Sequence, residues 1–126
     1  MFKIVMVFIL VFFVYDSIAQ AASAEQIKKE LHDTGFVMGY AGACIKKSGR
    51  KYTEVEAKEC GQRIGQKYKK WGAKVSQYLL EGAHLGMLAW GSEKGKRCQE
   101  AIKSSITIME SYGLTGKDYR PFLVPN

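Results

Sequence analysis

Apolar and polar positions follow a helical period through most of the chain, most regularly between Thr53 and Trp90. Steps of four and three residues link a run of apolar, aromatic or small side chains there: Ala57, Gly61, Ile64, Tyr68, Trp71, Val75, Tyr78, Gly82, Leu85 and Ala89. A 3.5-residue repeat keeps one stripe of a helix against a partner helix. Thr53 and Glu56 resemble a capping box, and the stripe stays in register across Gly72. We therefore predict one long helix over residues 53–90.

A shorter helix is predicted on each side of this long one. The first covers residues 24–47 and stops at Gly49, because glycine adopts the left-handed conformation that ends a helix. The other covers residues 93–112 and is closed by Gly113. Short connections join antiparallel neighbours. The pattern predicts an all-α fold, a small antiparallel three-helix bundle built on one long central helix.

The first 24 residues have the form of a cleaved signal peptide. A single charge at Lys3 precedes an apolar run from Ile4 to Tyr15, which spans about 18 Å as a helix. A bilayer core is about 30 Å thick, so an uncleaved anchor is the weaker alternative. Small residues follow at which cleavage is expected: Ala19, Ala21 or Ala24. We expect a periplasmic or secreted protein, with the Gram-negative periplasm as the default.

Residues 25–113 are then expected to form the helical bundle domain, and residues 114–126 an irregular tail. The tail is apolar enough to dock on the bundle or on a partner, and the chain between residues 75 and 90 is apolar nearly all round, which favours a dimer. The candidate partner-facing residues are Tyr119, Phe122, Leu123, Leu80 and Met87.

Glycines recur four residues apart, a spacing that lets helix backbones approach closely. The pairs are Gly35 with Gly39, Gly61 with Gly65, Gly82 with Gly86, and Gly91 with Gly95. Close packing inside a small bundle is the ordinary interpretation, and a membrane-inserting or self-associating surface is the alternative.

The chain carries a formal net charge of +7. The candidate basic patch comprises Lys46, Lys47, Arg50, Lys51, Lys67, Lys70 and Lys74. Such a patch attracts anionic partners, and for an exported protein these are anionic lipid, cell-wall polymer or an acidic protein; nucleic acid is not expected. A solvated helix face is the plain alternative.

Three cysteines, Cys44, Cys60 and Cys98, are expected to form one disulfide in an oxidising compartment and to leave one thiol. Cys44 is expected to pair with Cys98 or with Cys60. No C-x-x-C motif or metal-ligand spacing is present, and no cofactor is expected. A Cys98–His84 nucleophile and base is conceivable, but nothing marks an orienting third residue, so an enzyme is not the expected class.

Two functions remain after these exclusions. The first is an exported helical protein-binding module that inhibits, neutralises or assembles with a protein partner, as immunity proteins, inhibitors and secretion accessories do. The second is a cationic envelope protein that binds anionic lipid or cell-wall polymer. The form of the chain is only a weak argument for either function.

Overall fold

The computed structural model describes residues 2–125, with side chains from Ala24 onwards. The chain divides into two compact units, Met1–Glu30 and Leu31–Asn126. Nearly all of the predicted signal peptide lies outside the residues whose side chains are described, so its assignment stays a prediction. Within the part of the chain that was described, no helix is long and apolar enough to cross a membrane.

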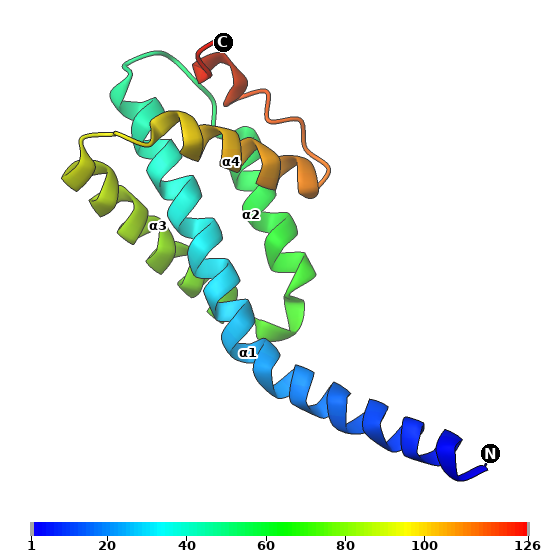
Figure 1. Cartoon of the computed structure of the whole chain (residues 1–126). Helices are drawn as coiled ribbons and strands as arrows, with labels where there is room; N and C mark the ends of the chain where they lie inside the picture. The colour runs from blue at the N-terminus through cyan, green and yellow to red at the C-terminus, as the bar shows by residue number, and fades with distance from the viewer. Residues whose placement is uncertain (1, 126) are drawn as a thin grey trace. The chain divides into compact units, whose positions relative to one another are not determined.

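The regular secondary structure of the described residues consists of helices, with no strand, as the sequence pattern predicted. The elements, in chain order, are α1 (Phe2–Lys47), α2 (Val55–Lys67), the 3₁₀ helix η1 (Lys69–Trp71), α3 (Lys74–Glu93), α4 (Cys98–Ser111) and the 3₁₀ helix η2 (Arg120–Phe122). Figure 1 shows α2 and α3 on either side of the C-terminal half of α1, with α4 crossing near the end of that helix. The described chain thus has four α-helices where three were predicted.

The predicted long helix over residues 53–90 is wrong, because the chain breaks between α2 and α3. Gly72 has φ 57° and ψ −135°, a backbone conformation that side chains larger than hydrogen disfavour. The chain therefore folds back at η1, and α3 contacts α2. A 3.5-residue stripe that stays in register across a turn does not distinguish one long helix from two helices folded against each other.

Glycines on facing sides of α1 and α3 bring the two backbones into contact. A β carbon on Gly35 would meet Leu79 and Ala83, and one on Gly39 would meet the Ala83 backbone again. The contacted residues of α3 shift toward its C-terminus as the glycine shifts toward the C-terminus of α1. The two helices therefore run parallel. The break at Gly72 explains this departure from the predicted antiparallel bundle, since it reverses the chain a second time.

The core of the second unit lies between α1, α2 and α4. Its most fully buried side chains include Leu31, Tyr40, Ala41, Ile45, Cys60, Ile64, Ile102, Ile106 and Met109. Most of these side chains belong to α1 and α4. The third helix begins later than expected, at Cys98, because Lys94 (φ 56°) and Gly95 (φ 72°) are left-handed and end α3 first.

The C-terminal tail docks on the start of α2 through a buried carboxylate. Glu56 is 5% exposed, and its Oε1 accepts hydrogen bonds from the Thr115 hydroxyl (2.7 Å) and the Thr115 amide (3.1 Å). The Glu56 amide donates to Asp118 Oδ2 at 3.1 Å. Glu56 therefore holds the tail, while the helix has Glu54 at its N-cap without a side-chain cap bond; the predicted Thr53–Glu56 capping box is not formed.

Candidate binding site

The close contact between α1 and α3 determines which side of α3 is exposed. Gly82 and Gly86 are buried against α1, where a β carbon on either would clash with the backbone of His32 or of Phe36. Because the inner side of α3 carries its smallest residues, several large apolar side chains lie elsewhere on the helix. Burial of α3 is therefore achieved through backbone contact rather than through its leucines.

The outward side of α3 carries Leu80, His84, Met87 and Leu88, which we call the α3 outer face. These positions are spaced i, i+4, i+7 and i+8, so they share one side of a helix. Leu80 is 69% exposed, Met87 53% and Leu88 57%. Exposed large apolar side chains that adjoin one another mark an interaction surface more often than isolated ones do.

A hollow of about 420 Å³ lies beside this face, where α3 meets the end of α1. Its lining comprises Ala43, Lys46 and Lys47 from α1, and His84, Met87, Leu88 and Trp90 from α3. We call it the Trp90 hollow. The α3 outer face and the Trp90 hollow share His84, Met87 and Leu88, while Leu80 belongs to the face alone.

A disulfide fixes the wall of the Trp90 hollow. Cys44 and Cys98 are bonded, with their α carbons 5.8 Å apart, and Cys44 directly follows Ala43 of the lining. A β carbon on Gly95 would lie 3.1 Å from both Cys98 Sγ and Trp90 Nε1. The bond therefore ties the last turns of α1 to the turn that packs against Trp90.

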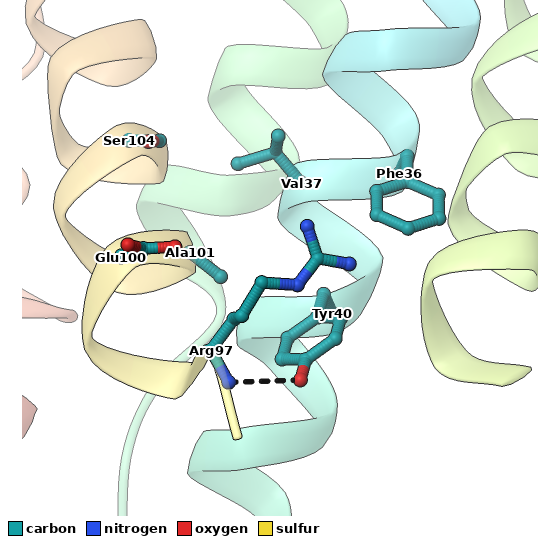
Figure 2. A pocket seen from close by; sticks show the side chains of 7 residues that line it. All are labelled: Phe36, Val37, Tyr40, Arg97, Glu100, Ala101 and Ser104. Carbon is teal, nitrogen blue, oxygen red and sulfur yellow. Dashed lines mark hydrogen bonds between the residues drawn. The ribbon is translucent and has the colours of Figure 1, made fainter. Parts of the chain in front are cut away.

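A second, smaller cavity of about 120 Å³ lies between α1 and α4. Figure 2 shows its lining, in which the Arg97 amide donates to the Tyr40 hydroxyl at 3.0 Å. The Arg97 guanidinium lies over the rings of Phe36 and Tyr40, and its Nε bonds Glu93 at 2.7 Å. The hydrogen bond to Arg97 and its positive charge lower the pKa of Glu93. Because Arg97 is already paired, it offers no free positive charge to an anionic ligand in this cavity.

The structure shows the disulfide pairing, which the sequence left open between two alternatives. Cys44 pairs with Cys98, one of the two expected alternatives, and Cys60 is a buried free thiol. Burial raises the pKa of Cys60, which disfavours the reactive thiolate. The conceivable Cys98–His84 pair is excluded, because the Cys98 sulfur is bonded to Cys44. In the described residues, no three metal-ligating side chains cluster.

The predicted basic patch is two separate clusters. Lys46 and Lys47 line the Trp90 hollow at the end of α1, close in sequence to Arg50 and Lys51. Lys67, Lys70 and Lys74 gather near the turn between α2 and α3. Since α3 rises about 1.5 Å per residue, Lys74 lies roughly 20 Å along the helix from Met87. Lys67, Lys70 and Lys74 were expected on one long helix over residues 53–90, and that helix is broken.

Two of the candidate partner-facing residues are exposed and one is buried. Leu80 and Met87 lie on the α3 outer face, but Tyr119 is only 4% exposed, and burial raises its pKa. Tyr119 is therefore a core residue of the docked tail and cannot face a partner. Phe122 and Leu123 are half-buried, and the Phe122 ring packs against Tyr52 at 6.0 Å.

The C-terminal tail also contacts one residue of the predicted basic patch, Arg50. The Arg50 guanidinium lies 5.0 Å from the centre of the Phe122 ring, and its Nη1 donates to the Pro121 carbonyl at 3.3 Å. Arg50 thus holds the tail against the α1–α2 connection. Lys46 and Lys47, beside the Trp90 hollow, are exposed.

Sequence reasoning missed Ala43, Leu88 and Trp90 as site residues and considered His84 as a base for Cys98. The Gly82–Gly86 pair held the missing signal, since it identifies the buried side of α3 and so places His84 and Leu88 opposite. The proximity of Ala43 to Trp90 had no such signal, because it depends on the parallel packing of α1 and α3. We compared the chain with protein-family models, with curated proteins and with solved structures, and none of them matches it.

Proposed function

We propose that the protein is exported and acts as a protein-binding module whose partner lies on the α3 outer face. The observation that carries this proposal is the row of exposed apolar side chains at Leu80, Met87 and Leu88. A helix with apolar anchors at i, i+7 and i+8 suits helix-mediated recognition. Binding there inhibits, neutralises or assembles the partner.

Export is supported by two independent features. The predicted signal peptide directs the chain out of the cytoplasm, and the Cys44–Cys98 disulfide is of a kind that persists in oxidising compartments. The periplasm or the extracellular medium is therefore the proposed location. A homodimer through the same face is the alternative occupant that the experiment below separates.

The test is a native pull-down from envelope extract at low and high salt, using the full chain expressed for export. Wild type is compared with Leu80→Lys and with a matched control, Val55→Lys, which adds the same charge at another exposed apolar residue (63% exposed). We expect one stoichiometric partner, retained at high salt by wild type and Val55→Lys but lost by Leu80→Lys. Equal recovery by both variants would contradict the assignment of the face.

A cationic envelope protein is the second candidate, favoured by the exposed lysines at the end of α1. Lys46 and Lys47 are exposed and adjoin an apolar surface, an arrangement that suits anionic lipid or polymer. Association driven by these charges weakens as salt screens them. Recovery of only mixed acidic material, lost at high salt, would favour this candidate over a dedicated protein partner.

A further inference from the structure

The Trp90 hollow has the size and composition of a small-molecule site. At about 420 Å³, it falls within the roughly 300–1,000 Å³ range of ligand pockets, which are mostly apolar with a few placed polar groups. Ala43, Met87, Leu88 and Trp90 supply the apolar surface. Their shared character predicts a ligand with an alkyl or other apolar portion.

The polar part of the lining is entirely basic in type. Lys46, Lys47 and His84 line the hollow, and none of the residues that line it is acidic. Glu93, the acidic residue at the end of α3, is engaged by Arg97 at 2.7 Å. Lysine stems cover apolar surface while their ammonium groups stay at its edge, so an anionic head group would lie at the rim.

The helix end at the rim decides between anionic head groups. Lys46 and Lys47 occupy the last turn of α1, where the helix dipole is negative. Phosphate groups are commonly held by the free N–H groups of helix N-termini, which this end does not offer. A singly charged carboxylate is therefore better suited to this rim than a dianionic phosphate.

We propose that the Trp90 hollow binds one free fatty acid, with the alkyl chain against Met87, Leu88 and Trp90 and the carboxylate between Lys46 and Lys47. This ligand is separate from the protein partner proposed above, since Leu80 does not line the hollow. Binding of the acid covers Met87 and Leu88 and so changes the surface that a partner meets.

The test uses isothermal titration calorimetry on the full chain expressed for export, with the disulfide intact. Laurate is titrated below its micelle concentration, and dodecyl phosphate and dodecyl maltoside serve as dianionic and neutral comparisons. We expect saturable one-to-one binding of laurate, with affinity at least tenfold weaker for both comparison ligands. Quenching or a blue shift of tryptophan fluorescence, lost in Trp90→Phe, places the ligand at the hollow.

Matched charge variants complete the test. Lys46→Gln/Lys47→Gln is expected to weaken laurate binding at least tenfold. The control Lys69→Gln/Lys70→Gln, with the same change in charge near the other end of α3, is expected to change it less than twofold. Absence of saturable laurate binding, or equal losses in the two variants, would overturn the proposal. Leu80→Lys is expected to bind laurate as wild type does. The pull-down therefore tests the protein partner, and the titration tests the fatty acid site independently.

Discussion

The α carbon of His32 lies only 2.9 Å from the point at which a β carbon on Gly82 would sit. That separation is shorter than a carbon–carbon van der Waals contact, so only glycine allows α1 and α3 to approach as they do. The same approach turns the larger side chains of α3 outward. The exposed face of α3 is thus a consequence of how its opposite side packs.

Gly82→Ala is expected to destabilise the protein by about 2 kcal/mol. Forcing a methyl group into a packed contact costs typically 1–3 kcal/mol, which exceeds the gain of up to about 1 kcal/mol in helix propensity. Gly91→Ala is the matched control, because a β carbon there meets nothing within 4 Å. Urea unfolding should show a loss for the first variant and a small gain for the second. Equal effects would show that the α1–α3 contact is looser than described.

Loss of the disulfide is expected to lower the free energy of unfolding by about 4 kcal/mol. The bond joins residues separated by 54 positions, and closing a loop of this length constrains the unfolded chain by about that amount. Cys44→Ala/Cys98→Ala and wild type under reductant should give similar urea midpoints.

Cys60→Ala provides the control for the pairing. Because Cys60 is a free thiol, reductant should destabilise this variant as much as it destabilises wild type. This holds even if the substitution itself changes the stability of the oxidised protein. Insensitivity of Cys60→Ala to reductant would instead mean that Cys60 takes part in the bond.

Acid should unfold the protein partly through Glu56. Desolvation raises the pKa of Glu56, but hydrogen bonds from the Thr115 hydroxyl and from the amides of residues 115–117 outweigh it and lower the pKa below 4.5. The folded state therefore holds this proton less tightly than the unfolded chain does. The resulting stability is present above pH 4.5 and is lost as pH falls through the folded-state pKa.

Glu56→Gln removes this contribution at every pH. Urea unfolding at pH 7 and below pH 4 should show a smaller acid-induced loss in the variant than in wild type. The lowered pKa of Glu93 contributes to both proteins and so cancels in the comparison. If acid lowered the free energy of unfolding equally in the two proteins, the acid sensitivity would have to arise from groups other than Glu56.

The sequence predicted that the protein is helical, that α1 ends at Gly49 and that α4 ends at Gly113. These features were predictable because apolar periodicity and left-handed glycines are local signals. The turn at Gly72 was not, since the apolar repeat is satisfied equally by a continuous helix and by a folded pair. Tyr119 was misjudged for a similar reason. Its burial depends on a tail held by Glu56, more than fifty residues away along the chain, and no local pattern reports such a contact.

Part of the candidate site followed from the sequence. Leu80 and Met87 were predicted to face a partner and are exposed, and Cys44–Cys98 was one of two pairings that the sequence allowed. The joining of Lys46 and Lys47 with Trp90 in one hollow was not predicted. It requires that α1 and α3 run parallel, which the assumed long helix ruled out.

The most direct measurement of the central proposal is site-specific photocrosslinking in the envelope of cells that export the protein. A photoreactive residue is placed at position 80, on the α3 outer face, or at position 55, which is similarly exposed on α2. We predict one crosslinked heteromeric product from position 80, identified by mass spectrometry, and none of it from position 55. The same products from both positions, or only a homodimer from position 80, would contradict a dedicated protein partner on this face.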